Sequence, residues 1–186
     1  MNKTLSLIAI VLATAATSFA GQAASSKKVV VASDDCRFRA NEWQVDAAVV
    51  GAGGTYNSNN GQGLGGGLGV NYFFSQYFGV GVDNTVGAYQ KVAGSGGGTQ
   101  AVDSLQADLI ARYPICAWNL APYAMIGGGA NWGGGTQGDG NVGGGLEYRV
   151  SRNVGLFADC RWLYGGNEGG ARLSMALPRM GVRFAF

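Results

Sequence analysis

Carboxylate and guanidinium side chains recur at even spacing within the apolar segments of this chain. Asp108 precedes Arg112 by four residues, and Glu147 precedes Arg149 by two. Residues two or four apart lie on one face of a β-strand. Carboxylates and arginines placed in this way can form two-point ion pairs, and carboxylates alone can act as general acids or bases. The first question is therefore whether these groups serve catalysis or structure.

The composition argues against catalysis. Histidine is absent from the 186 residues, which excludes Ser-His triads, other imidazole-based mechanisms and most zinc sites. Only a mechanism built on Asp, Glu or Ser remains, and no serine stands with an acid in a recognisable constellation. We expect no enzymatic activity, no catalytic residue and no metal site.

One short motif fits a cofactor site. Gly61-x-Gly63-x-x-Gly66 matches the dinucleotide fingerprint, and Asp83 follows at about the required 20 residues. The fingerprint needs a helix directly after the glycines, and the sequence predicts none there. We expect no cofactor.

Charge is low throughout. Only 13% of the residues are charged, 34 are glycine, and the formal net charge of +2 is too small to indicate nucleic acid. Residues 1–20 have a positive start at Lys3, an apolar core and a small-x-small ending at Ser18–Ala20, as in a secretory signal peptide. A membrane-anchoring helix is the alternative, but the apolar part is shorter than the roughly 20 residues that a span needs. Residues 21–41 show no sustained period and are interpreted as a periplasmic N-terminal tail.

From residue 42 to residue 186 the apolar residues alternate with period two, which predicts β-strands. The predicted strands are 43–50, 64–74, 78–86, 105–113, 120–132, 142–150, 154–162 and about 177–186. The predicted links alternate between short (75–76, 114–119, 151–153) and long (51–61, 90–103, 133–139, 165–170). Short turns at one end and long loops at the other are typical of an up-and-down barrel.

The charged residues within the strands all lie on the face opposite the aliphatic and aromatic side chains. They are Asp46, Asp83, Asp108, Glu147 and Asp159 with Arg112, Arg149, Arg161, Arg179 and Arg183. Lysine is absent from these predicted strands, and buried pairing favours arginine. We therefore predict an all-β, eight-stranded antiparallel up-and-down transmembrane β-barrel, with the apolar face in lipid and the charged network inside. A secreted soluble ligand-binding barrel would need the opposite arrangement of faces.

Aromatic residues gather at the predicted strand ends, as in the two interfacial girdles of a membrane barrel. Those at the short-turn end are Trp43, Tyr72, Phe74, Phe78, Tyr113, Tyr148, Phe184 and Phe186, and those near the loop end are Trp132 and Trp162.

With these features in place, the chain resembles the small eight-stranded outer-membrane barrels of Gram-negative bacteria, the OmpA-like and OmpX-like porin superfamily, in its barrel domain only. The ending RMGVRFAF is similar to the C-terminal signal that their assembly machinery reads, through Arg179, Gly181, Phe184 and Phe186. The segment GGGLEYRVSRNVGLFADCRWLYG resembles the hairpin of their sixth and seventh strands. The resemblance implies outer-membrane localisation, contact with outer-membrane lipid and with the barrel assembly machinery, and a monomer.

Three cysteines complete the candidate residues. Cys160 falls mid-strand on the lipid face and is interpreted as an apolar filler. Cys36 and Cys116 would both lie at the periplasmic end, an oxidising compartment, so we hypothesise a disulfide that ties the tail to the barrel.

Two functions stay open at this point. An interior filled by ion pairs suits a structural, envelope-integrity or surface-interaction protein, and an interior whose pairs rearrange suits a narrow porin-like channel for small solutes or ions. The loops are weakly charged and name no external ligand.

Overall fold

The computed structural model of the chain describes residues 36–56, 58–91, 98–133, 135–166, 170 and 172–186. The predicted signal peptide (1–20) and residues 21–35 of the predicted tail lie outside these ranges. Within the described ranges, no helix is long and apolar enough to cross a membrane.

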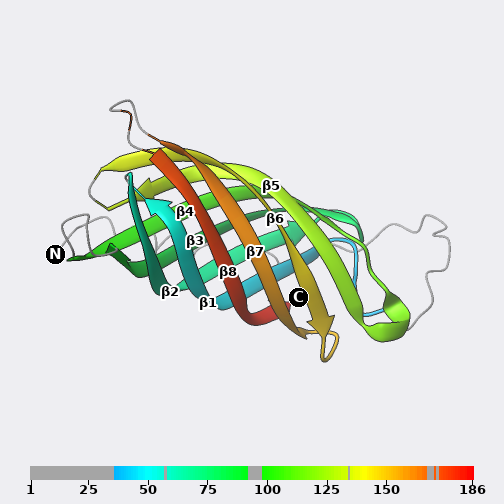
Figure 1. Cartoon of the computed structure of the whole chain (residues 1–186). Coiled ribbons are helices and arrows are strands. Elements are labelled where there is room, and N and C mark those ends of the chain that lie inside the picture. Colours follow the sequence, from blue (N-terminus) through cyan, green and yellow to red (C-terminus); the bar gives the residue numbers. More distant parts are fainter. Residues whose placement is uncertain (1–35, 57, 92–97, 134, 167–169, 171) are drawn as a thin grey trace, which may run out of the picture. The chain divides into compact units, whose positions relative to one another are not determined.

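Eight strands form a closed barrel in which each strand pairs antiparallel with the next and β8 pairs with β1 (Figure 1). The strands are β1 (Glu42–Tyr56), β2 (Asn59–Phe73), β3 (Phe78–Lys91), β4 (Gly98–Arg112), β5 (Leu120–Trp132), β6 (Thr136–Arg149), β7 (Val154–Gly166) and β8 (Arg172–Ala185). One short 3₁₀ turn, η1 (Cys116–Trp118), lies between β4 and β5. The predicted fold class is confirmed.

The strands are longer at the loop end than the sequence predicted. The predicted link 51–61 is wrong over most of its length, because β1 runs to Tyr56 and pairs there with Asn59. In the same way β4 begins at Gly98, and β8 begins at Arg172 instead of near Leu177. These segments are rich in glycine and small polar residues, so no hydrophobic alternation marks them. The ladder needs only backbone N–H and C=O groups, which every glycine supplies.

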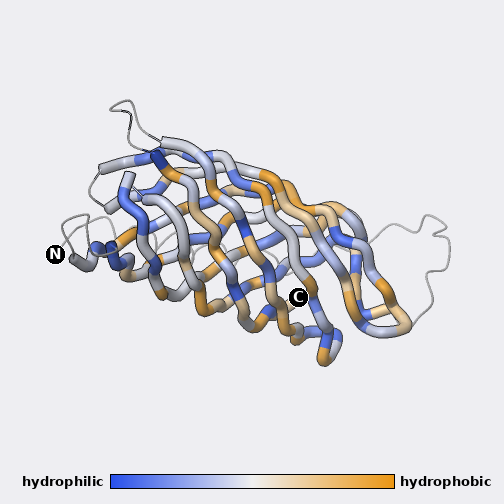
Figure 2. Tube along the Cα trace, viewed as in Figure 1, coloured by the Kyte–Doolittle hydropathy of each residue, from blue (hydrophilic) through white to orange (hydrophobic). Residues whose placement is uncertain are grey.

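Hydrophilic and hydrophobic residues alternate along the wall (Figure 2), and buried positions alternate with exposed ones over most of each strand. Leu109, Leu146 and Leu156 point outward and are 63%, 51% and 48% exposed, whereas the predicted interior residues Glu147 and Arg183 are 0% and 3% exposed. In water such a surface would be unfavourable, because large contiguous apolar patches are rare on soluble monomers. The barrel has the surface of a protein whose outer wall lies in lipid.

Glycines line the inner face of β2, at positions 61, 63, 65, 67 and 69. A side chain there would collide with the neighbouring strand: an added Cβ on Gly65 would stand 2.7 Å from the Cα of Gly87 on β3. The bare inner wall of β2 leaves room for long side chains from the opposite strands. The guanidinium of Arg161 on β7 reaches across the barrel to Asp83 on β3, at 2.8 Å.

Candidate functional site

The candidate site is the barrel interior, where the alternation of the strands gathers the charged residues. All ten of the predicted interior residues point inward. Eight of them are buried, namely Asp46, Asp108, Arg112, Glu147, Arg149, Asp159, Arg161 and Arg183, and Asp83 and Arg179 are half-buried. They form two groups, one toward the short turns and one toward the loops.

The turn-side cluster is a chain of alternating acids and bases. Glu42 accepts bonds from Arg112 at 3.0 Å and from Arg149 at 2.5 Å. Arg149 also bonds Glu147, which accepts a second bond, at 2.7 Å, from Arg183. The cluster consists of Glu42, Asp46, Arg112, Glu147, Arg149 and Arg183, and its three acids balance its three arginines.

Arg183 also donates two hydrogen bonds to Asp46, from Nε to Oδ1 at 2.7 Å and from Nη2 to Oδ2 at 2.6 Å. Asn71 donates to the same carboxylate at 2.9 Å. Removing a charged group from water is costly unless the group is paired and hydrogen-bonded. Here Arg183 and Asp46 are paired with each other and hydrogen-bonded.

The loop-side cluster joins Asp83, Asp108 and Asp159 to Arg161 and Arg179. Arg161 Nη2 bonds Asp83 at 2.8 Å and Asp108 at 2.7 Å. Arg179 holds Asp159 through Nε at 2.8 Å and Nη2 at 2.9 Å, and it also reaches Asp83 at 3.1 Å. This cluster has three carboxylates for two guanidiniums, so it is not balanced as the turn-side cluster is.

Sequence reasoning left Glu42 and Asp139 out of the predicted interior, and it did not single out Tyr123. Glu42 shares the inward parity of Asp46, but it is the first residue of its strand and was treated as a boundary. Asp139 fell inside a predicted loop, whereas it lies on β6 and faces inward. Tyr123 donates its hydroxyl to Asp159 at 2.6 Å. A parity count continued to the strand ends would have found Glu42 and Asp139, whereas Tyr123 lies inside the predicted strand 120–132.

A segment before β1 covers the turn end of the interior. The structure joins Cys36 to Cys116 by a disulfide, with the two Cα atoms 4.8 Å apart. Phe38 is 2% exposed, and the guanidiniums of Arg112 and Arg149 each lie 5.2 Å from its ring centroid. Such contacts are favourable cation–π geometry. We call residues 36–41 the cap.

Further hydrogen bonds tie the cap to three turns. Arg37 donates to the carbonyl oxygens of Arg149 and Val150, at 2.7 and 2.6 Å. Gln76, in the link between β2 and β3, donates to the carbonyl oxygen of Phe38 at 3.3 Å. The cap is therefore fixed to the β2–β3, β4–β5 and β6–β7 turns.

Apolar side chains fill the interior toward the loops. This cluster contains Val50, Tyr56, Tyr89, Leu163, Leu173, Met175 and Leu177. A cavity of about 40 Å³ lies beside it, and one of about 10 Å³ lies near Asp46 and Arg179. These volumes hold at most a few water molecules, because one water needs about 10–15 Å³.

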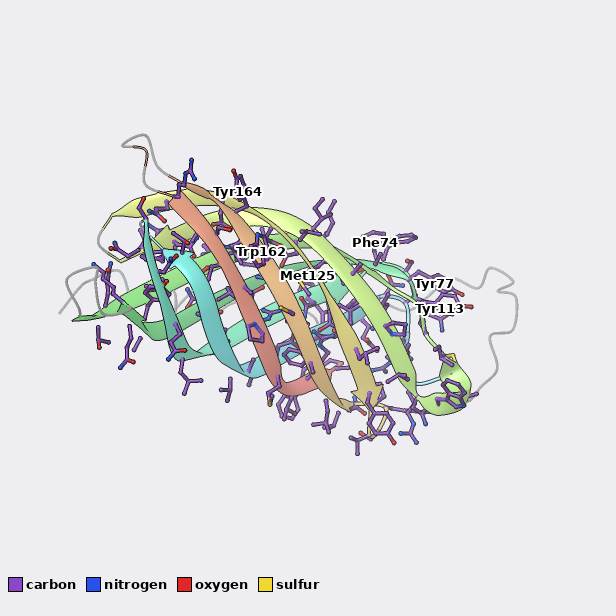
Figure 3. The ribbon with its side chains drawn as sticks, in the orientation of Figure 1. Phe74, Tyr77, Tyr113, Met125, Trp162 and Tyr164 are labelled. Carbon is purple, nitrogen blue, oxygen red and sulfur yellow. A yellow bond between two sulfur atoms is a disulfide. The ribbon has the colours of Figure 1, made fainter. Side chains whose placement is uncertain are left out.

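The outer wall carries the predicted aromatic girdles. Figure 3 shows Phe74, Tyr77 and Tyr113 together at the turn end, and Tyr164 toward the other end. On β4 and β5 the girdles are marked by Tyr113 and by Trp132, which stands opposite Asp103. The stretch from Asp103 to Tyr113 has the roughly 9–11 residues with which a tilted strand crosses a bilayer. The residues of β4 before Asp103 therefore extend beyond the girdle.

The residues of the predicted assembly signal divide between the faces. Arg179 and Gly181 point inward, and Phe184 and Phe186 point outward, 43% and 67% exposed. Cys160 is free and exposed on the outer wall. Among the described residues, no group of three or more His, Cys, Asp or Glu side chains is arranged to hold a metal ion.

No protein-family model matches the chain, and no curated protein matches it. Solved structures match. Neisserial surface protein A (NspA) aligns with a TM-score of 0.62 and 21% identity, over 78% of this chain and 96% of that chain. The N-terminal β-barrel domain of Pseudomonas aeruginosa OprF gives 0.55 and 20%, over 80% and 99%. The outer membrane protein OprG from Pseudomonas aeruginosa gives 0.52 and 10%, over 82% and 99%.

At these identities the likeness concerns the fold. The chain has the fold of the small eight-stranded outer-membrane β-barrels, as the alternation and the ending of the sequence predicted.

Proposed function

We propose that the protein is an integral outer-membrane β-barrel that supports the cell envelope or presents a surface for interaction, with an interior closed by its own side chains. One observation carries the proposal: ion-paired residues fill the inside while leucines such as Leu109 stand exposed on the outside. A closed barrel is one of two structures that satisfy every backbone hydrogen bond in lipid. The names of the matched surface and outer-membrane proteins support the same location.

A non-enzymatic role fits the interior chemistry. Each interior arginine bonds at least one carboxylate, and the chain has no histidine to serve as a base. Since one fold hosts many functions, this part of the proposal depends on the site and not on the barrel.

The narrow channel is the alternative. The two clusters of ion pairs, the cap and the apolar cluster all lie across the interior of the barrel. They favour a blocked interior over an open channel. Recording from the folded protein in planar bilayers decides between them. We expect no reproducible conductance steps, and regular steps that change with salt concentration would favour the channel.

Location has its own experiment. The protein should stay in the membrane fraction after a carbonate wash and should migrate differently on gels before and after boiling. Release by carbonate without detergent would instead support the soluble ligand-binding barrel.

Export and assembly complete the proposal. We propose that residues 1–20 are removed on export, that residues 21–41 form a periplasmic tail, and that residues 42–186 enter the outer membrane as a monomer. The ending with Phe184 and Phe186 would be read by the barrel assembly machinery. Sequencing the N-terminus of the mature protein tests the removal of residues 1–20. A Phe186→Ser variant that still assembles at the normal rate would argue against recognition of the C-terminal ending by the assembly machinery.

A further inference from the structure

A groove of about 570 Å³ lies on the outer wall of the barrel, across β8, β1, β2 and β3. Two rows of outward residues on these neighbouring strands form it. The row nearer the loops consists of Ala176, Gly53, Gln62 and Gln90, and the next row consists of Pro178, Gly51, Leu64 and Ala88. An added Cβ on Gly53 would meet nothing within 4 Å, so the space over it is open. The groove has the size of a small-molecule site, for which about 300–1,000 Å³ is usual.

Larger apolar side chains bound the groove on the side toward the middle of the wall. Val49 and Val86 stand there, 57% and 53% exposed, and Gly66 lies between them and leaves a gap in their row. Val86 is paired with Asp103, and Asp103 is paired with Trp132 of the loop-side girdle. The groove therefore begins beside the row of Trp132, at the edge of the bilayer on the loop side.

The loop-side girdle has a gap over this groove. Its aromatic residues stand on β5 and β7, where Trp132, Trp162 and Tyr164 are 39%, 49% and 72% exposed. On the described parts of β8, β1, β2 and β3, from the groove to the loop ends, no aromatic side chain faces outward. The aromatic residues of that region, Tyr56 and Tyr89, are buried inside the barrel. The level that indole and phenol rings occupy on β5 and β7 is thus left open on these four strands.

The backbone in the floor of the groove lacks one hydrogen-bond donor. At the other end of the same seam, Trp43 and Phe186 exchange both backbone bonds, at 3.3 and 2.9 Å. Such pairs recur at every second residue of an antiparallel ladder, so the register makes Gly51 and Pro178 one of them. Pro178 has no N–H to donate. The pairing of β1 with β8 is interrupted there and resumes in the same register. The carbonyl oxygen of Gly51 therefore receives no ladder bond from β8, in a wall where lipid cannot replace it.

We propose that the groove binds one bilayer lipid whose headgroup carries hydrogen-bond donors. The headgroup lies over the row nearer the loops, where the side-chain amides of Gln62 and Gln90 and the carbonyl oxygen of Gly51 are acceptors. The acyl chain leaves the groove over Gly66 and runs along the apolar wall. Gln62 and Gln90 are directly paired, so their Cβ atoms stand about 5 Å apart and both amides can serve one headgroup.

The position of the groove identifies its occupant. The groove opens onto the wall that contacts lipid and is continuous with it, so the bilayer itself supplies the ligand. The described residues that line the groove include no charged side chain, so hydrogen bonding and shape select the lipid, and charge does not. The inference rests on the proposed membrane location. Retention in the membrane fraction after a carbonate wash does not depend on the groove, so failure of one proposal is distinguishable from failure of the other.

Titration of the folded protein in detergent with phosphatidylethanolamine, followed by native mass spectrometry, tests the proposal. The protein should retain one lipid per barrel in a saturable manner. Phosphatidylcholine with the same acyl chains has no hydrogen-bond donor in its headgroup, so its dissociation constant should be at least about fivefold higher. Absence of saturation at one lipid, or equal affinity for the two lipids, overturns the proposal.

Substitutions that fill the groove make the test specific to it. Gly53→Leu places a side chain in the open space and should raise the dissociation constant of phosphatidylethanolamine at least about tenfold. Ala176→Leu fills the same row from β8 and decides the matter if Gly53→Leu does not fold, as judged by the gel shift on boiling. The matched control is Gly138→Leu, on the outer face at the loop end of β6, where an added Cβ also meets nothing within 4 Å. Unchanged binding in the folded groove variants, or an equal loss in the control, contradicts the site. A dimer that Gly53→Leu abolishes would show instead that the groove contacts a second copy of the chain.

Discussion

Asp46 on β1 and Arg183 on β8 stand directly opposite each other at the seam where the first and last strands close the barrel. Two guanidinium nitrogens of Arg183, Nε and Nη2, donate hydrogen bonds to the carboxylate of Asp46, at 2.7 and 2.6 Å. A slip of one residue in the pairing of β8 would turn Arg183 outward into lipid, because the side-chain period of a strand is two. The pair therefore favours one register at the seam.

The Asp46–Arg183 pair should be strongly coupled in stability. Arg183→Leu leaves buried carboxylates without their partner and should lower the free energy of unfolding by about 3–5 kcal/mol. The double variant Asp46→Leu with Arg183→Leu should recover part of that loss. Urea unfolding in phospholipid vesicles measures both. Arg172→Leu, on the exposed rim of β8, serves as control and should change stability by less than about 0.5 kcal/mol. Simple additivity of the losses from the single variants Asp46→Leu and Arg183→Leu would show that the pair is not coupled.

The loss of stability caused by a charged residue on the outer wall should depend on the depth of that residue in the bilayer. Leu109 lies near the middle of the stretch between Asp103 and Tyr113, so Leu109→Arg should destabilise the barrel by about 2–4 kcal/mol. Tyr164→Arg, toward the loop end, should cost only about 0–1 kcal/mol. The free energies of unfolding of the two variants, measured in lipid vesicles, give the comparison. Equal effects at the two positions would mean that the wall does not cross a bilayer as the girdles indicate.

Parity alone predicted the fold and the side of the wall for residues such as Glu147 and Arg161. The rule works because a strand has only two faces and a charge is tolerated on one of them. It did not predict which acid meets which arginine, because the partners lie on strands far apart in sequence, as Arg161 and Asp83 do.

The strand ends escaped prediction for a different reason. Residues 51–56 and 98–103 contain glycine and small polar residues that give no hydrophobic alternation, and their pairing follows from backbone bonds to a neighbour already in register. Asp139 was lost from the predicted interior with these ends. The cap could not be predicted as a cover because Phe38 belongs to a segment without a period, and its place over the interior is given by its contacts with Arg112 and Arg149.

Gly181, at the seam between β8 and β1, should be required because there is no room for a side chain at that position. An added Cβ on Gly181 of β8 would stand 2.8 Å from the Cα of Ala48 on β1, and backbone cannot yield there without opening the pair. Gly181→Ala should lower stability by about 1–3 kcal/mol or prevent closure. Gly53→Ala is the matched control, because an added Cβ there meets nothing within 4 Å. The boiled-to-unboiled gel shift reports the folded fraction of each variant, and equal folding of the two would contradict the crowding at the seam.

The disulfide should hold the cap in place without being needed for the barrel. Cys36 and Cys116 are 80 residues apart in sequence, and closing a loop of that length lowers the entropy of the unfolded chain enough to contribute up to about 4.5 kcal/mol. Cys36→Ser should therefore lower the unfolding temperature while leaving the gel shift intact, since the strand ladder does not include residue 36. A thiol count on the unreduced wild-type protein should find one, Cys160, and three after reduction. Cys160→Ala is the control and should not change the unfolding temperature. A count of three before reduction would remove the disulfide, and the cap would then depend on noncovalent contacts such as those of Phe38, Arg37 and Gln76.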